Sequence, residues 1–101
     1  MMLHTVNKSP FERNALESCL RLAASGASVL LIEDGVVAVL AGTSASDRIA
    51  GRSGDLKFYV LGPDIDARGL GDKPLIDGIE IVDHAGFVDL VVAHDAVNAW
   101  L

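Results

Sequence analysis

Residues 28–32 read SVLLI, residues 33–35 read EDG, and residues 36–41 read VVAVLA. The first run is almost entirely apolar, which is typical of a parallel strand covered on both faces. Asp34-Gly35 can form the tight turn of a β-hairpin between two apolar arms. Alternatively, Asp34 can cap a short buried helix over Val36 to Ala41. The local sequence favours the hairpin. The alternation of strands and helices around it favours the helix, because parallel strands need a crossover between them, and we predict the helix.

On the N-terminal side, residues 2–6 form a short apolar, β-branched segment that we predict to be a strand. Ser9 is a candidate N-cap, Pro10 suits the first helical position, and Glu12 completes a capping box. The following apolar residues fall at i, i+3, i+4 and i+7, the spacing of an amphipathic helix. They are Leu16, Cys19, Leu20 and Ala23. We predict one helix of about four turns that ends near Gly26.

On the C-terminal side, strands and helices continue to alternate. Small and polar residues at 43–55 predict a mobile loop, residues 56–61 a strand, 65–70 a short helix, and 79–82 a further strand. Asp83 is a suitable N-cap for a last helix over residues 85–94, which apolar side chains nearly surround. Residues 95–101 can add a fifth strand ending in Trp100. We predict one α/β domain over residues 1–101: a flavodoxin-like three-layer sandwich with a mainly parallel sheet of four to five strands.

The amino-acid composition of the chain argues against several classes of function. Half of the 101 residues are apolar, which is enough for a core but more than so small a domain can hide, so we expect an oligomer. The net charge of −6 disfavours direct binding to nucleic acid. No stretch approaches the ~20 apolar residues of a membrane span. The N-terminus does not resemble a signal peptide, so we expect a cytoplasmic protein.

A parallel sheet binds ligands at the carboxyl ends of its strands. The residues predicted there are acidic or small and include no thiol: Asn7, Lys8, Ser9, Glu33, Asp34, Gly35, Gly62, Pro63, Asp64, Asp83 and His84. No glycine-rich phosphate motif occurs, and Gly69-Leu70-Gly71 follows a predicted helix rather than a strand. We therefore expect no cofactor.

The single cysteine and the three histidines are the remaining candidates for chemistry. Cys19 lies within the apolar stripe of its helix, away from the helix N-terminus, which predicts a buried and inert thiol. A persulfide-carrying or partner-facing thiol is the alternative, and it makes Cys19 the one weak catalytic candidate. His4 is predicted to be a hydrogen-bonded core residue. Asp83-His84 fits a helix cap better than half of a catalytic pair, and no spacing of His4, His84 and His94 predicts a metal site.

Several short motifs, in order along nearly the whole chain, resemble the DsrH/TusB family. They are Leu3-His4-Thr5-Val6, Lys8-Ser9-Pro10, Glu33-Asp34-Gly35-Val36, Tyr59-Val60-Leu61 with Ala67-Arg68-Gly69, Phe87-Val88, and Ala99-Trp100-Leu101.

The resemblance implies a small subunit of a cytoplasmic sulfur relay. Its partners would be DsrE-like and DsrF-like subunits, or TusD-like and TusC-like subunits, in a heterohexamer with two copies of each. In such a relay a cysteine of the DsrE or TusD subunit carries sulfur as a persulfide to a small carrier, DsrC or TusE. This chain has no cysteine after its third strand, so no catalytic residue is carried over and we expect a non-catalytic, interface-forming subunit.

The resemblance leaves the pathway open. Dsr-type members have a cysteine in the first helix that Cys19 would match, which favours sulfur oxidation. The alternative is a TusB-like role in forming tRNA 2-thiouridine. Two further hypotheses are a sulfurtransferase that acts through Cys19 and a stand-alone small-molecule binding module.

Overall fold

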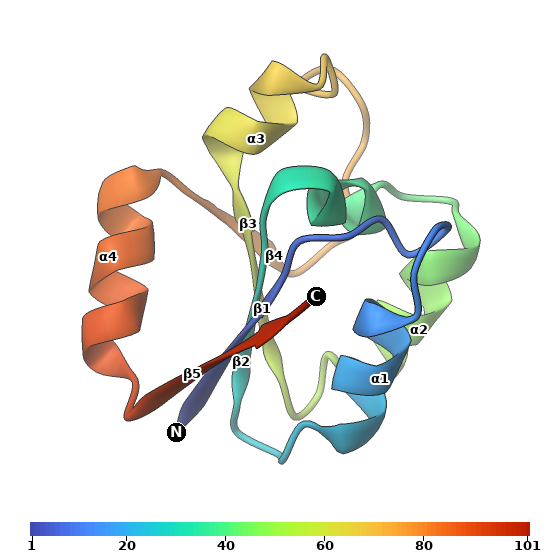
Figure 1. The fold of residues 1–101 in the computed structure, drawn as a ribbon. Helices are drawn as coiled ribbons and strands as arrows, with labels where there is room; N and C mark the ends of the chain where they lie inside the picture. The colour runs from blue at the N-terminus through green and yellow to red at the C-terminus, as the bar shows by residue number, and fades with distance from the viewer.

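The computed structural model describes residues 1–101 and contains one five-stranded sheet in which every strand pair is parallel (Figure 1). The strands are β1 (Met2–Val6), β2 (Ser28–Leu31), β3 (Lys57–Leu61), β4 (Ile79–Val82) and β5 (Ala96–Trp100). Their order is β4-β3-β2-β1-β5, which differs from the 2-1-3-4-5 order of flavodoxin itself. The predicted parallel α/β architecture is confirmed, including the fifth strand that ends in Trp100.

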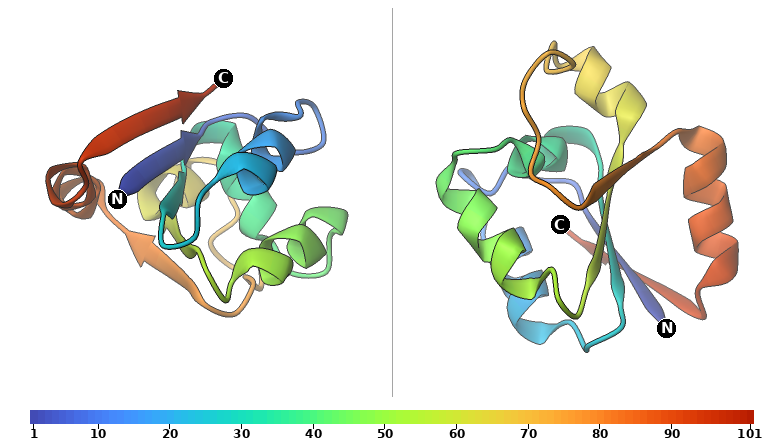
Figure 2. Two further views of the ribbon diagram at one scale, coloured as in Figure 1. Left: turned by 90° about the horizontal axis from the view of Figure 1, so that it is seen from below. Right: turned by 180° about the vertical axis from the view of Figure 1, so that it is seen from behind.

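Helices cover the two faces of the sheet unequally. α1 (Ala15–Leu22), the 3₁₀ helix η1 (Glu33–Val39) and α2 (Ser44–Arg52) lie on one face, and α4 (His84–Ala93) lies alone on the other (Figure 2). α3 (Gly62–Ala67) follows directly at the carboxyl end of β3. The chain therefore forms three layers, of which the layer that contains α4 is the thinner.

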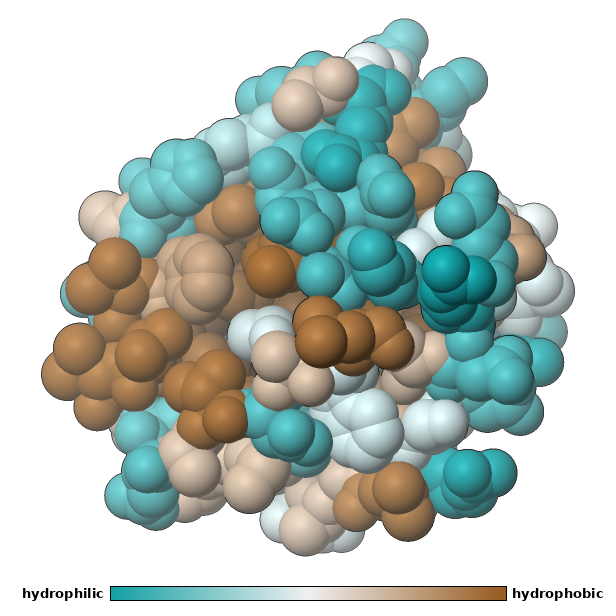
Figure 3. Space-filling model, viewed as in Figure 1, coloured by the Kyte–Doolittle hydropathy of each residue, from teal (hydrophilic) through white to brown (hydrophobic).

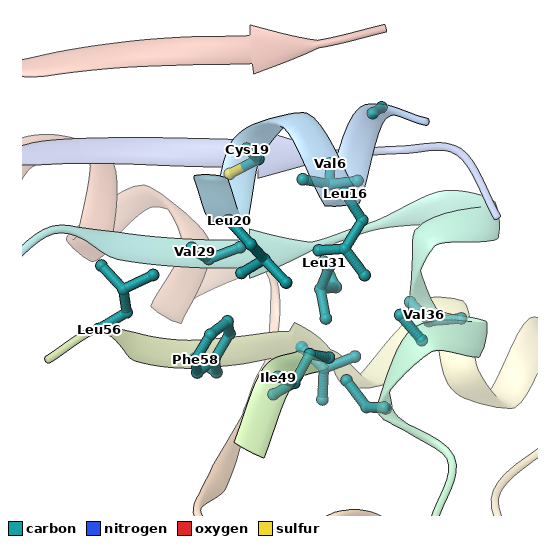
Figure 4. Close-up of a cluster of buried hydrophobic side chains, with 14 of the residues drawn as sticks. Val6, Leu16, Cys19, Leu20, Val29, Leu31, Val36, Ile49, Leu56 and Phe58 are labelled. Atoms are coloured by element: carbon teal, nitrogen blue, oxygen red, sulfur yellow. The ribbon is translucent and has the colours of Figure 1, made fainter. Parts of the chain in front are cut away.

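The main core lies between the sheet and α1, η1 and α2 (Figure 4). Alternate residues of a strand point to the same face, so Val29 and Leu31 of β2 face this core together and pack with Leu16 and Leu20 of α1. α1 buries one stripe, made of Ala15, Leu16, Cys19 and Leu20. The predicted amphipathic spacing around Cys19 is confirmed.

The predicted start of the first helix is wrong. Ser9 is not its N-cap: the Ser9 hydroxyl accepts a hydrogen bond from the Phe11 N–H at 3.2 Å, within a separate turn that includes Pro10. α1 begins at Ala15, and the side chain before it, Asn14, makes no capping hydrogen bond. The capping-box pattern is satisfied by a single turn as well as by a helix, because both begin with the same local hydrogen bond.

The predicted mobile loop at residues 43–55 is also wrong, because α2 occupies most of it. The Thr43 side chain caps this helix by accepting from the Ala45 N–H at 3.3 Å. Ala45 and Ile49, four residues apart, are buried against the core. Two core contacts are thus sufficient for a helix whose other positions are polar, small or glycine.

The segment after β2 is a crossover and not a hairpin arm. Residues Glu33–Val39 form η1, which starts earlier than predicted and is a 3₁₀ helix with Ile32, rather than Asp34, at its N-cap position. The short helix predicted at residues 65–70 likewise starts earlier, at Gly62, with Pro63 in its first turn. Farther on, Asp83 caps α4 as predicted, because its carboxylate accepts from the Gly86 N–H at 2.8 Å.

Candidate functional site

The carboxyl ends of β2 and β3 are tied together by charged groups. The Glu33 N–H donates to the Asp64 carboxylate at 2.6 Å, and Arg68 forms an ion pair with Asp34 at 3.0 Å. Arg68 also donates to the Asp64 carbonyl at 3.3 Å. The predicted edge residues of these two strands do come together, but as a structural network in which arginine neutralises the acids. The carboxylates of Asp34 and Asp64 are thereby paired with Arg68, whereas Glu33 takes part only through its backbone N–H.

A hollow of about 590 Å³ lies between the carboxyl ends of β3 and β4, where α3 and α4 leave toward different faces of the sheet. This is the position at which open parallel sheets bind ligands. Its lining residues are Gly62, Pro63, Asp66, Ile81, Val82, Asp83 and Gly86. They include the carboxylates of Asp66 and Asp83 but no thiol, hydroxyl or imidazole, and Asp83 already accepts the Gly86 N–H.

The carboxyl end of β1 offers no reactive pair either. Ser9 is engaged in its turn, and the side-chain oxygen of Asn7 is shielded from solvent without a hydrogen-bond partner. Lys8 makes no ion pair. Gly35 lies so close to this strand end that a Cβ atom at its position would be 2.2 Å from the Val6 carbonyl oxygen. Beside β1, the carboxyl edge of the sheet therefore consists of tightly packed backbone.

Cys19 lies on the face of α1 that packs on the sheet and is completely buried (Figure 4). Burial raises the pKa of its thiol to about 12, although the positive charge of Arg52 acts in the opposite direction. The thiolate is the nucleophilic form of cysteine, and at neutral pH this side chain remains a thiol. The predicted burial of Cys19 in the core is confirmed.

Arg52 joins α2 to the end of α1 and was not anticipated from the sequence. Its guanidinium donates to the carbonyls of Leu20 and Ala23, which α1 leaves without partners inside the helix. It also pairs with Asp55 at 2.8 Å, and this contact holds the pKa of Asp55 at about 2. The partners lie ~30 residues away in sequence, so only the short-range Arg52 and Asp55 spacing could have indicated part of this network.

Two histidines connect the sheet to its surroundings. His4 is buried in β1, and its Nδ1 accepts a hydrogen bond from the Trp100 indole N–H at 3.0 Å, as predicted for a core histidine. His94 follows α4; its Nδ1 donates to the Leu90 carbonyl at 2.6 Å, and its Nε2 lies 2.9 Å from the Ser28 hydroxyl. His84 is exposed at the start of α4. These contacts are structural.

We expect the His4 contact to make stability depend on pH. An indole N–H can only donate, so His4 Nδ1 must be unprotonated, and burial lowers the pKa of His4 below the ordinary 6.5. As pH falls below 6.5, the unfolded chain binds the proton first, so the stability present above that value is progressively lost. Urea unfolding followed by the fluorescence of Trp100, the single tryptophan, measures this loss.

The His4→Asn variant keeps an acceptor but does not titrate, so it should remove this part of the pH dependence. His84→Asn is the matched control because His84 is exposed, and it should leave the dependence unchanged. An unchanged pH profile in His4→Asn would contradict the assignment.

Other classes of site find no support in the side chains. No group of three or more His, Cys, Asp or Glu residues lies together in a way that could hold a metal ion. None of the helices is both long and apolar enough to cross a membrane.

The protein is similar to members of one family over almost its whole length. The family model described as "DsrH like protein" matches residues 8–97. Protein TusB of Pectobacterium parmentieri is 36% identical over 99 residues, covering 98% of this chain and 100% of that protein. Protein TusB of Escherichia coli K12 is 35% identical with the same coverage.

Two solved structures share the fold. The YchN protein of E. coli superposes with a TM-score of 0.87 at 22% identity, covering 97% of each chain. A protein of unknown function from Methanobacterium thermoautotrophicum has a TM-score of 0.73 at 17% identity, covering 97% of this chain and 96% of that one. At these identities the likeness concerns the fold alone. The family model over residues 8–97 and the TusB relatives at 35–36% identity show that this chain belongs to the DsrH/TusB family.

Proposed function

We propose that this protein is a non-catalytic subunit of a cytoplasmic sulfur relay of the TusB type, which serves formation of 2-thiouridine in tRNA. In this proposal it assembles with TusC-like and TusD-like subunits, with two copies of each, and the complex passes sulfur to a TusE-like carrier. The chemistry belongs to the TusD-like subunit, and this chain contributes surface to the assembly.

The observation that carries the proposal is the position of the only thiol. A persulfide carrier needs a cysteine that can become a thiolate and reach a partner. Cys19 is completely buried, and burial raises its pKa to about 12. The carboxyl edge, where a transfer cysteine would be accessible, is occupied by Gly62, Pro63 and Asp64 at the end of β3. This arrangement supports a subunit that does not carry sulfur.

The TusB branch fits better than sulfur oxidation, which the sequence alone favoured. That preference depended on the match between Cys19 and a first-helix cysteine of Dsr-type members, and a completely buried Cys19 lends this match no chemical role. The relatives of E. coli and P. parmentieri that match 98% of the chain are TusB proteins. The family model is described only as DsrH-like and does not distinguish the two branches, so the preference for tRNA thiolation depends on these relatives.

Replacing the thiol tests the proposal. Cys19→Ser places a hydroxyl among apolar side chains, so we expect it to lower the free energy of unfolding by about 1–3 kcal/mol. Sulfur delivery by the assembled complex should be unchanged. Mass spectrometry after incubation with a sulfur donor should find persulfide on the TusD-like subunit and none on this chain.

Cys19→Ala serves as a second variant, because it removes the thiol without adding a polar group. If either variant abolished delivery while the complex remained assembled, or if wild-type Cys19 took up sulfur, the non-catalytic role would be wrong. Deleting the gene in its host separates the two pathways. A drop in tRNA 2-thiouridine supports the TusB role, and a loss of sulfur oxidation alone would contradict it.

A further inference from the structure

α4 is apolar but buries almost nothing. None of its ten residues is counted among the buried ones, whereas the eight-residue α1 buries four. Val88, Val91 and Val92 are all exposed and lie at i, i+3 and i+4, so they form one stripe. Val92 is 79% exposed. A helix with such a surface is typical of one that packs against another molecule.

β5 continues this apolar surface. Val97 of β5 is in register with Leu3, and Leu3 is in register with Ser28 on the other side of β1. Ser28 contacts His94 at the end of α4, so Val97 lies on the face of the sheet that α4 covers. Val97 is nevertheless exposed. We call the surface made of Val88, Val91, Val92 and Val97 the α4–β5 face.

The α4–β5 face appears in Figure 3 as brown, hydrophobic side chains gathered on the left, over α4 and the start of β5. Teal, hydrophilic residues border it above and below. The arrangement of an apolar centre inside a polar rim is the anatomy of a protein–protein interface.

The segment that builds this face has side-chain charges of one sign. Two positive groups from elsewhere lie on the same side of the sheet or pair with the segment: Lys57, which is in register with Ser28, and the N-terminal ammonium, which pairs with Asp95. Residues 74–101, which form β4, α4 and β5, contain no lysine or arginine. They contain five exposed acids: Asp77, Glu80, Asp83, Asp89 and Asp95. Residues 1–73 hold the remaining nine acids and all eight basic residues, so their net charge is close to neutral. The negative charge of the chain is therefore concentrated in the segment that builds the α4–β5 face.

This asymmetry decides between two kinds of partner. In a two-fold symmetric dimer the same patch of both copies meets, so Asp89 and its acidic neighbours would oppose their own counterparts. Like charges across an interface are unfavourable. A different subunit with an apolar centre and lysine or arginine at its rim can cover the exposed valines and also pair with the acidic residues.

We infer that the α4–β5 face is the docking surface for a different protein subunit, whose contact surface is apolar with a basic rim. The inference depends on the proposed function in one respect: the TusC-like and TusD-like subunits are the partners to be tested.

The experiment measures binding of the full-length chain to purified TusC-like and TusD-like subunits of the same organism. Val92→Asp places a charge at the centre of the face and should weaken binding at least ~30-fold, the size of a hot-spot loss. Leu22→Asp is the matched control, because Leu22 is 64% exposed on α1, on the opposite face of the sheet. It should bind as the wild type does. Circular dichroism should show both variants folded, since neither side chain is buried.

The charge component has its own test. Asp89→Lys should weaken binding roughly tenfold, with the loss shrinking as salt is raised, because rim charges act mainly through screened long-range attraction.

Three results would be informative in different ways. Wild-type affinity in Val92→Asp overturns the inference and leaves the proposed function intact. A wild-type homodimer that Val92→Asp converts to monomers also overturns it, because the occupant would be a second copy. Absence of binding between the wild-type chain and either subunit counts instead against the proposed function.

Discussion

Gly35→Ala should destabilise the protein by about 3 kcal/mol or more, which is a large part of the stability of a domain this small. A Cβ atom at this position would lie 2.2 Å from the Val6 carbonyl oxygen and 3.0 Å from its carbon. Both are backbone atoms, so no side chain can rotate away to make room. The same carbonyl accepts the Ile32 N–H at 3.0 Å, and moving it would disturb the end of the β1–β2 pair.

The matched control is Gly51→Ala. Gly51 lies in α2, and a Cβ atom there would meet no other atom within 4 Å. Since alanine is the better helix former, this variant should gain about 0.5 kcal/mol. Urea unfolding compares the two directly. Equal stability of Gly35→Ala and the wild type would mean that η1 does not pack against the end of β1.

Phe58→Ala should cost about 3–5 kcal/mol, the usual range for deleting a buried aromatic ring. Phe58 of β3 is 4% exposed and lies in the main core, near Ile49 of α2 (Figure 4). Its removal leaves a cavity between α2 and the sheet. The backbone of β3 cannot move to fill this cavity because β3 pairs with β2 on one side and with β4 on the other.

The same substitution at an exposed phenylalanine isolates the effect of burial. Phe11 is 55% exposed, so Phe11→Ala should change the free energy of unfolding by no more than about 0.5 kcal/mol. Urea unfolding of both variants at low protein concentration measures the difference. Similar losses for Phe58→Ala and Phe11→Ala would show that the core is not where the structure places it.

The strands could be predicted because the pattern of apolar residues within each segment is enough to indicate a strand. Residues 28–31 are apolar throughout, and the β2 strand they form is buried on both faces. The Asp83 cap was also predictable, since it uses a contact three residues away. Cys19 could be placed in the core because its neighbours in the stripe, Leu16 and Leu20, are within one helical turn.

Helix limits were harder to predict because local signals compete. Ser9-Pro10 and the Thr43-Ser44 pair both read as helix starts or turns, and only one of them caps a helix here. For α2 the choice depends on whether Ala45 and Ile49 find a core to fill, and that core is built by residues from β2, β3 and α1. No window of the sequence contains this information.

The residues considered for function also fall into those that the sequence could place and those that it could not. The sequence alone established that one thiol exists, that no strand is followed by a cysteine, and that basic residues stop at Lys73. It also indicated that apolar residues nearly surround the last helix, but not which of them remain uncovered.

Composition and short-range spacing therefore determined the parallel strands, the buried cysteine and the acidic C-terminal third of this protein. Only the tertiary structure decided that Arg52 reaches the end of α1, that Gly35 lies against β1, and that α4 stands alone on its face. The physical reason is the separation in sequence between the residues that make each contact. Strand and cap patterns arise from neighbours two to four residues apart, whereas these contacts join segments about 30 residues apart, and burial depends on which elements the fold places over one another.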